Sequence, residues 1–242
     1  QVSVALDTSG NSLHQRGYRT ATNIAPINEV LAAGILMLSG WEGQGHFLDP
    51  MCGSGTFLAE AAMIACNIPP NINRKEFAFE KWNDWDADLF DQIMDSLMKK
   101  IREFHYTIKG YDKAPSAVSK ARDNIKNANL EEYIKIEECN FFDNEKETEG
   151  KLHMVFNPPY DERLDIHMEE FYKNIGDTLK KNYPATNAWF ITANLEALKF
   201  VGLKPSRKIK LFNASLEARL VKYEMYEGSK RTKFQQNFDT LN

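Results

Sequence analysis

The chain has 242 residues, 43% of them hydrophobic, and a formal net charge of −4. This length and apolar content are sufficient for a single domain with a substantial core, and the slightly negative charge excludes a protein that coats nucleic acid by charge alone. The longest apolar stretch, Val30 to Leu38, is too short to cross a bilayer, and no leader precedes it. We therefore expect a soluble domain with no membrane partner, and Gln1 in place of Met indicates a fragment of a longer chain.

The three cysteines, Cys52, Cys66 and Cys139, are odd in number and widely spaced, with no Cys-x-x-Cys pair. This arrangement predicts neither a disulfide framework nor a zinc site. We expect no metal and a reducing, cytoplasmic environment.

Charge is distributed unevenly along the chain. Residues 199–233 contain ten Lys or Arg and three Glu, a local charge of +7 that leaves −11 for the remainder. A solvated surface and a surface that faces a polyanion explain such a segment equally well.

The first 27 residues read as a small extension. Weak alternation from Val2 to Leu6, followed by the turn-forming residues 7–11, predicts a hairpin. The main domain then covers residues 28–242 and begins with a helix from Glu29 to Leu38, whose apolar residues are spaced along one face.

A strand, a glycine loop and a helix come next. His46 to Leu48 forms the strand, residues 49–56 (Asp-Pro-Met-Cys-Gly-Ser-Gly-Thr) the loop, and Phe57 to Cys66 the helix. Gly53 and Gly55 allow the backbone to approach a ligand closely, and the helix offers free N–H groups to an anion. The loop matches neither the dinucleotide fingerprint nor a P-loop, which disfavours NAD binding and ATP hydrolysis.

Residues 67–105 interrupt this alternation and are predicted to be an insertion at the rim of a sheet. An acidic helix is expected from Ala87 to Phe104, after four aromatic residues between positions 77 and 85. Local packing of these rings is favoured over base stacking because the surrounding acids would repel phosphates.

Two further strand ends carry polar side chains. Asp112 ends the strand that starts at Thr107, where an acid can accept both hydroxyls of a ribose or can simply stabilise the next helix. Asn140 follows the strand from Tyr133 to Glu138 and could pair with an adenine edge. Phe141 would either cover the adenine face or pack in the core.

The buried strand from Leu152 to Phe156 stops abruptly at Asn157-Pro158-Pro159-Tyr160. The Asn157 side chain and the Pro158 carbonyl could accept the two hydrogens of a planar NH2 group, while Tyr160 stacks on the group that carries it. A rigid turn at a strand end is the alternative interpretation. A helix near 168–181, a strand near 188–193 and a hairpin of 208–212 with 219–227 complete the expected elements.

Together these residues resemble a known family. The loop at 49–56, Asp112, Asn140 and Asn157-Pro158-Pro159-Tyr160 are similar to the successive motifs of class I S-adenosylmethionine (SAM)-dependent methyltransferases that act on amino nitrogens. The wider pattern resembles THUMP-associated RNA guanine-N2 methyltransferases of large-subunit ribosomal RNA. The segments that carry this second resemblance are residues 13–19 (Leu-His-Gln-Arg-Gly-Tyr-Arg), 25–26 (Ala-Pro), 161–164 (Asp-Glu-Arg-Leu) and 211–217 (Leu-Phe-Asn-Ala-Ser-Leu-Glu).

The resemblance implies a Rossmann-like α/β fold: a mostly parallel seven-stranded sheet with helices on both faces and a C-terminal antiparallel hairpin. It implies SAM as cofactor, with Asp49 and the Cys52-Gly53-Gly55 loop at the methionine end, Asp112 at the ribose, and Asn140 with Phe141 at the adenine. It places Asn157, Pro158 and Tyr160 at the target amine. Arg16, Arg19 and Arg163 would bind RNA, with ribosomal RNA as the expected partner.

Two departures from the family pattern stand out. Asn140 occupies a position where the family usually has Asp, and no THUMP domain precedes residues 13–19. The chain therefore resembles a monomeric catalytic domain of a longer protein. Because they share the Asn-Pro-Pro-Tyr sequence, an adenine-N6 DNA methyltransferase and a protein glutamine methyltransferase are alternatives, and a non-catalytic RNA-binding scaffold is a more distant one.

Overall fold

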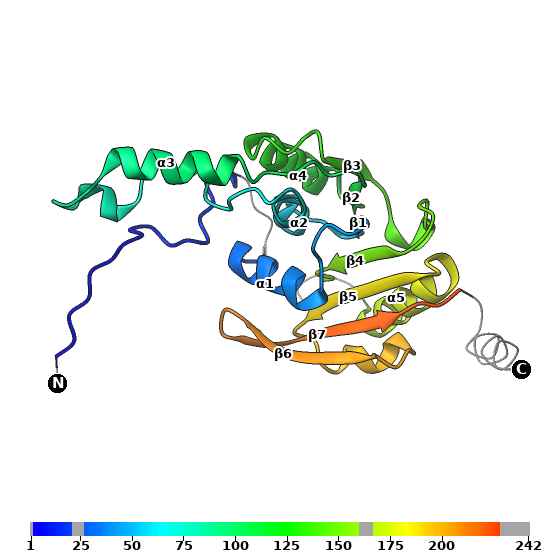
Figure 1. Cartoon of the computed structure of the whole chain (residues 1–242). Helices are drawn as coiled ribbons and strands as arrows, with labels where there is room; N and C mark the ends of the chain where they lie inside the picture. The colour runs from blue at the N-terminus through cyan, green and yellow to red at the C-terminus, as the bar shows by residue number, and fades with distance from the viewer. Residues whose placement is uncertain (1, 21–26, 160–166, 228–242) are drawn as a thin grey trace, which may run out of the picture.

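The computed structural model describes residues 2–20, 27–159 and 167–227, which form a seven-stranded sheet with helices on both faces (Figure 1). The strand order is β3-β2-β1-β4-β5-β7-β6. The strands are β1 His46–Asp49, β2 Ile108–Asp112, β3 Ile134–Glu138, β4 Leu152–Phe156, β5 Thr186–Thr192, β6 Arg207–Asn213 and β7 Leu216–Glu224. The helices are α1 Glu29–Ser39, α2 Thr56–Cys66, α3 Ala87–Met98, α4 Pro115–Asn127 and α5 Met168–Asn182, with 3-10 helices η1 Ala78–Lys81, η2 Phe141–Asp143 and η3 Ala197–Val201.

Strand direction fixes where a ligand can bind. The neighbours β3, β2, β1, β4 and β5 pair in parallel, whereas β7 runs antiparallel to both β5 and β6. The carboxyl ends of the five parallel strands, and that of β6, therefore lie at one edge of the sheet. Open α/β sheets bind their ligands at this edge. The predicted Rossmann-like fold with its C-terminal hairpin is confirmed.

Two apolar clusters sandwich the sheet, as the alternation along its strands requires. In β4, Val155 packs into the cluster with α1, α2 and α4, while Met154 and Phe156 pack into the cluster with α5 and η3. Close contact between layers depends on Gly110 in β2, where an added Cβ would lie 2.3 Å from Leu58 Cδ1 of α2. Both faces of the sheet are thus buried at the strands that end near the glycine loop.

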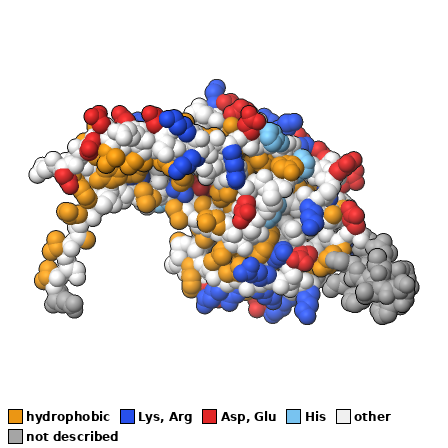
Figure 2. Space-filling model, in the orientation of Figure 1, with side chains coloured by type: hydrophobic (Ala, Val, Ile, Leu, Met, Phe, Trp, Pro, Cys, Tyr) orange, Lys and Arg blue, Asp and Glu red, His pale blue; other side chains and the backbone are white. Residues whose placement is uncertain are grey.

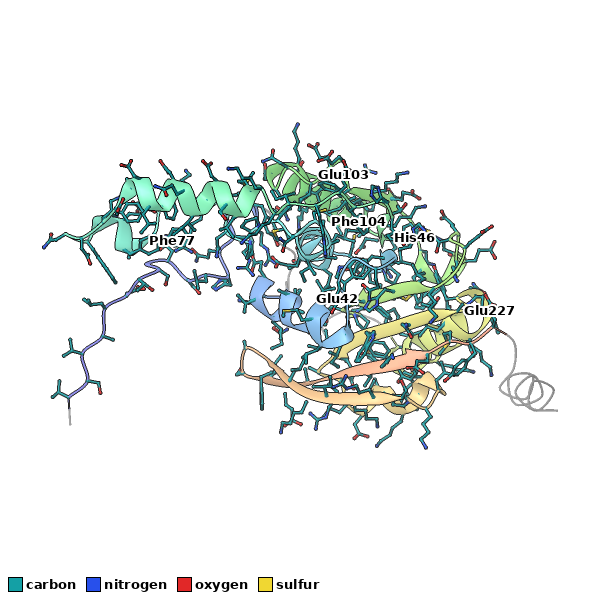
Figure 3. The ribbon with its side chains drawn as sticks, viewed as in Figure 1. Glu42, His46, Phe77, Glu103, Phe104 and Glu227 are labelled. Atoms are coloured by element: carbon teal, nitrogen blue, oxygen red, sulfur yellow. The ribbon has the colours of Figure 1, made fainter. Side chains whose placement is uncertain are left out.

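The predicted insertion forms an arm, made of η1 and α3, that projects from the body beside the N-terminal segment (Figure 1). Its aromatic rings pack on one another, with centroids 5.0 Å apart for Phe77 and Phe79 and 5.1 Å apart for Trp85 and Phe90. Figure 3 shows Phe77 on this arm, away from the sheet. The expected local packing of these rings is confirmed. Helix α3 ends at Met98, short of the predicted Phe104.

The predicted N-terminal hairpin is wrong, because residues 2–20 contain no strand. Their backbone groups bond to the arm instead of to a partner strand. The Arg74 guanidinium donates to the carbonyls of Ser9 at 2.7 Å and Asn11 at 2.5 Å, and the Phe79 N–H donates to the Thr8 carbonyl at 3.2 Å. Sequence alternation cannot reveal such a distant partner.

Two further observations complete the comparison with the expected elements. Strand β7 begins at Leu216 and ends at Glu224, whereas the sequence predicted 219–227. Among the described residues, no helix has the length and apolar character needed to cross a membrane.

Candidate active site at the carboxyl edge of the sheet

The glycine loop connects β1 to α2 and bonds to the end of β2. Gly53 and Gly55 adopt left-handed backbone conformations, with φ of 54° and 83°, which favour glycine. The Cys52 N–H donates to the Tyr111 carbonyl at 2.8 Å, so the loop is anchored on β2. Helix α2 begins directly after Gly55 and has no side-chain cap, which leaves its first N–H groups available to an anionic ligand.

Asp49 is a buried acid at the end of β1, with 1% of its surface exposed. Its Oδ1 accepts the Met51 N–H at 3.1 Å. Burial raises the pKa of this carboxyl well above its usual value, and the nearby Asp112 carboxylate raises it further. A site with two acids close together and one of them desolvated favours a cationic ligand.

Cys52 lies in the same loop, and burial raises the pKa of its thiol, with Asp49 and Asp112 contributing. The thiol is therefore neutral at ordinary pH, and a neutral thiol is a poor nucleophile. Cys52 therefore contributes to the predicted site through its backbone and not through its thiol.

Asp112 contacts the loop directly. Its Oδ2 accepts the Gly53 N–H at 3.0 Å and its Oδ1 accepts the Ala114 N–H at 3.0 Å. Each carboxylate oxygen can accept a second hydrogen bond, so this half-buried side chain retains acceptor capacity. Asp112 therefore stabilises the start of the next helix and contacts the loop, and its role toward a ribose stays a prediction.

Asn140 follows β3 at the same edge, where the Cys139 N–H donates to the Asp112 carbonyl at 3.0 Å. The Asn140 amide donates to Asp143 Oδ2 at 2.6 Å. Position 140, where the family usually has Asp, thus carries an amide that bonds to an acid three residues later. Phe141 corrects an expectation: it is 2% exposed, and its ring packs against Phe156 and Tyr183. Its ring belongs to the core and leaves no face for adenine.

Asn157 directly follows β4, and the environment of its side-chain oxygen is unusual. Its Oδ1 is buried and has no hydrogen-bond partner among the described residues. An unpaired buried acceptor costs about 1–3 kcal/mol, and in native proteins such groups are often functional. Pro158 is buried beside it. Tyr160 and Arg163 lie outside the described residues.

Arg16 is not at the surface, contrary to the expectation that it binds RNA. Its guanidinium is 7% exposed and pairs with the buried Glu60 carboxylate, Nε to Oε1 at 3.3 Å. It also donates to the Leu13 carbonyl at 3.1 Å. Burial raises the pKa of Glu60 to about 7 against the opposing effect of Arg16. This arginine holds the N-terminal segment to α2.

Arg19 is likewise engaged inside the protein, with a 13% exposed side chain. Its Nη2 donates to Thr56 Oγ1 at 2.6 Å and to the Ile27 carbonyl at 2.9 Å, and its Nε lies 3.1 Å from Glu29 Oε1. These contacts hold the guanidinium between α2 and the start of α1, although its Nε makes no hydrogen bond among the described residues. Arg19 also lines a groove beside α1, so its role in RNA binding stays a prediction.

A groove of about 670 Å³ opens beside this edge, between α1 and the tip of the β6–β7 hairpin. The carboxyl end of β6 lies at the same edge as Asn157, so the groove and the strand ends face the same side. Its walls combine apolar and polar side chains. The lining includes Val30, Leu31 and Leu38 of α1, Leu211 and Asn213 of β6, and the Arg19–Glu29 pair.

Basic side chains lie along the outer strand. Figure 2 shows Lys and Arg gathered at the lower margin of the molecule, where β6 and η3 lie. Arg207 and Lys208 are exposed and have no ion-pair partner within the part of the chain that the structure describes. Lys210, by contrast, pairs with Glu217 at 2.5 Å. A basic surface is thus present on β6.

Sequence reasoning missed a set of residues behind the glycine loop. Asn124 donates to the Ser54 carbonyl in the loop. Arg19 donates to the hydroxyl of Thr56, the last residue of the loop. Asn124 lies on the apolar face of α4. A polar residue at a position where the periodicity predicts burial is the one signal in the sequence that could have indicated it. No group of three or more His, Cys, Asp or Glu side chains in the described residues is arranged to hold a metal ion.

Comparisons with known proteins agree with this geometry. The profile of the family UPF0020, described as an RMKL-like methyltransferase domain, matches residues 16–222. The chain belongs to this methyltransferase family. The match covers the glycine loop, both acids, Asn140 and Asn157.

Individual relatives are similar over most of the chain. A Hahella chejuensis protein named ribosomal RNA large subunit methyltransferase K/L is 36% identical over 237 residues, which cover 93% of this chain and 33% of the relative. The structure of a methyltransferase, SMU.472, complexed with SAH is 34% identical, has a TM-score of 0.85, and is matched over 92% of this chain and 58% of its own. A Listeria monocytogenes structure named as an N6-adenine-specific DNA methylase is 31% identical, with a TM-score of 0.82, over 90% of this chain and 57% of its own. The chain thus spans a third of the Hahella relative and less than two thirds of either structure.

Proposed function

We propose that this chain is the catalytic part of a SAM-dependent RNA methyltransferase that methylates the exocyclic N2 of guanine, with large-subunit ribosomal RNA as substrate. The buried Oδ1 of Asn157, which has no hydrogen-bond partner among the residues that the structure describes, carries the proposal. This oxygen can accept a hydrogen bond, and it lies at the sheet edge where the glycine loop and two acids meet. An amino group supplies such a donor.

The residues at this edge fit the cofactor. The bound cofactor would supply an electrophilic methyl group on a positively charged sulfur. Asp49 offers a carboxylate to the cofactor's ammonium group, and the uncapped start of α2 offers N–H groups to its carboxylate. Asp112 has acceptor capacity for the ribose hydroxyls, and Asn140 lies beside it for the adenine.

Asn157 would act on the target amine through hydrogen bonding. Its Oδ1, together with the Pro158 carbonyl, would accept the hydrogens of the NH2 group and so orient the nitrogen lone pair. The bond strengthens as the nitrogen becomes pyramidal, so it stabilises the transition state more than the ground state. A fixed acceptor in a buried position needs no reorganisation during the reaction. Tyr160 is proposed to stack on the base.

Guanine in RNA is favoured over other planar amines by two considerations. The sequence resembles RNA guanine-N2 methyltransferases over most of its length, and the Hahella relative is named for ribosomal RNA. The exposed Arg207 and Lys208 would attract the phosphate backbone, and the groove of about 670 Å³ beside α1 would receive nucleotides next to the target. Adenine N6 in DNA is the second candidate, because the Listeria structure carries that name and adenine presents the same kind of amine.

Transfer of tritium from methyl-labelled SAM separates these candidates. Matched reactions would contain ribosomal RNA from cells that lack the modification, duplex DNA, or a glutamine-containing peptide. We expect label in RNA alone, with Asn157→Ala as the control for catalysis at this site. Label in DNA would support the second candidate, and SAM binding without transfer to any acceptor would contradict the proposed activity.

A further inference from the structure

Hydrogen bonds connect the N-terminal segment Arg16–Thr20 to the back of the glycine loop. They involve side chains of α4 and α2 and join residues more than thirty positions apart in sequence. Ser54 and Thr56 belong to the loop, whereas Asn124 and Arg19 lie outside it. Asn124 contacts the Ser54 carbonyl and Arg19 contacts the Thr56 hydroxyl, so both reach residues 54–56.

Asn124 is the centre of this arrangement. It is 0% exposed in the middle of α4, where an apolar residue would satisfy the helix pattern. Its Nδ2 donates to the Ser54 carbonyl at 3.0 Å, and its Oδ1 accepts the Thr20 N–H at 3.1 Å. Ser54 lies between the two left-handed glycines, so one side chain links the most flexible part of the loop to the N-terminal segment.

Arg19 forms a second link. Its bond to Thr56 Oγ1 reaches the first residue of α2, and its contacts with the Ile27 carbonyl and Glu29 reach the start of α1. Asn127 of α4 adds bonds to the Tyr18 carbonyl at 3.3 Å and to Thr20 Oγ1 at 3.0 Å. The segment is thereby held to three helices around the loop. Burying polar groups is costly unless they are paired, and the bonds of Asn124 and of Arg19 Nη2 supply partners here.

The function of a glycine loop explains why a fixed backbone matters. Glycine loses more conformational freedom on ordering than any other residue, so a loop with two glycines would bind a ligand weakly if binding had to order it. A loop that is already ordered avoids this cost, and affinity improves accordingly. Contacts at Ser54 and Thr56 provide that order from α4 and from the N-terminal segment.

We propose that Asn124, Thr56 and Arg19 are positioning residues that hold the glycine loop in its cofactor-binding conformation through the segment Arg16–Thr20. The inference rests on the proposed SAM site and adds that the N-terminal segment is coupled to it. Because coupling is reciprocal, cofactor binding must also stabilise the segment. Any domain that pulls on this segment in a longer protein would change cofactor affinity.

Calorimetric titration of SAM into purified variants tests the coupling. Asn124→Ala removes both bonds, and Thr56→Val removes the Arg19 acceptor while keeping the side-chain shape. Each should weaken SAM binding roughly three- to tenfold, the effect of losing one or two hydrogen bonds, and raise KM for SAM with little change in kcat. Thr56→Ser retains the hydroxyl and should bind like the parent.

Ser39→Ala is the matched control for stability. Ser39 bonds to the Leu36 carbonyl at 2.7 Å and to His153 Nε2 at 2.8 Å, is buried, and lies at the opposite edge of the sheet. The Ser39→Ala variant should have a lower melting temperature than the parent and the same SAM affinity. Hydrogen exchange supplies a second measurement, in which SAM should slow exchange of the Thr20 amide in the parent and less in Asn124→Ala.

The outcomes distinguish this inference from the proposed function. If the parent chain binds no SAM, the proposed function fails. If the parent binds SAM and Thr56→Val and Asn124→Ala bind it as tightly as Ser39→Ala does, the positioning role is overturned. An unchanged exchange rate at Thr20 on SAM addition would likewise overturn the coupling.

Discussion

Asp49→Asn separates the cofactor role of this acid from its effect on the fold. The asparagine has nearly the same shape and can still accept the Met51 N–H through Oδ1, so the end of β1 keeps its local hydrogen bond. The variant lacks the negative charge proposed to face the cofactor's ammonium group. A hydrogen bond to a charged group contributes about 1.5–3 kcal/mol, so Kd for SAM should rise roughly 10- to 150-fold.

The same substitution should stabilise the protein without ligand. Burial and Asp112 raise the pKa of Asp49, so the folded state holds a proton on this group more tightly than the unfolded state does. Asp49 therefore lowers the stability of the fold at neutral pH, and the parent's stability should increase as pH falls through the raised pKa toward the ordinary carboxyl pKa. Asn carries no charge, and each 1 kcal/mol gained would raise Tm by about 2–4 °C in a domain of this size.

Cofactor binding should depend on pH with the opposite sign. A cation beside Asp49 favours its ionised form, so SAM should bind more tightly above the raised pKa of the free protein and less tightly below it. The slope can reach about tenfold per pH unit for one proton. Calorimetry in buffers of different ionisation enthalpy would detect the released proton.

Asp49→Asn should show neither the slope nor the proton release. The reasoning is refuted if the variant binds SAM as well as the parent at every pH. It is also refuted if the variant is less stable than the parent without ligand.

The remaining predictions concern the other residues of the site and its surroundings. Asn157→Ala should lower kcat about 10²–10³-fold with little change in SAM affinity, whereas Asn157→Asp should do less harm because a carboxylate still accepts; equal rates for the alanine variant and the parent would exclude the catalytic role. Asp112→Ala should weaken SAM binding by about 1.5–3 kcal/mol, which titration would detect, and unchanged affinity would remove it from the site. Reversing the charge of Arg207 and Lys208 should raise KM for RNA and flatten its salt dependence, while Lys135→Glu on β3 at the opposite sheet edge should not; similar effects from both changes would indicate only a general effect of charge. Because burial raises the pKa of Glu60 to about 7, the parent's stability should decrease as pH rises from about 4.5 to about 7, and Glu60→Gln should flatten that profile in thermal melts; an identical profile would contradict this origin.

The order and type of most elements could be predicted because they follow local patterns. The glycine loop, the Pro pair after β4 and the apolar face of α4 each determine the local backbone conformation whatever surrounds them. Polar side chains at successive strand ends meet at one edge as a consequence of parallel topology. This is why Asp49, Asp112 and Asn157 could be grouped before their positions were known.

Long-range polar partners could not be predicted in the same way. Arg16 and Arg19 have the composition of an RNA-binding segment, yet Glu60 and Glu29 neutralise them inside the protein. The same applies to the N-terminal segment, whose backbone bonds to Arg74 of the arm. In each case the deciding partner is far away in sequence, and its charge or donor pattern has no periodicity to reveal it.

Phe141 illustrates a choice between core and site that composition leaves open. A ring after a strand end is compatible with both, and the outcome depends on whether α5 and β4 supply a pocket for it. Phe156 and Tyr183 do so here. Only the packing of residues brought together by the whole sheet settles such a case.

The identity of the methylated nucleoside tests the central claim most directly. Ribosomal RNA that lacks the modification would be incubated with deuterated-methyl SAM and either the parent chain or Asn157→Ala, then digested to nucleosides and analysed by mass spectrometry. The account predicts labelled N2-methylguanosine with the parent and at least about a hundredfold less with the variant. Labelled N6-methyladenosine, or equal labelling by the parent and Asn157→Ala, would contradict it.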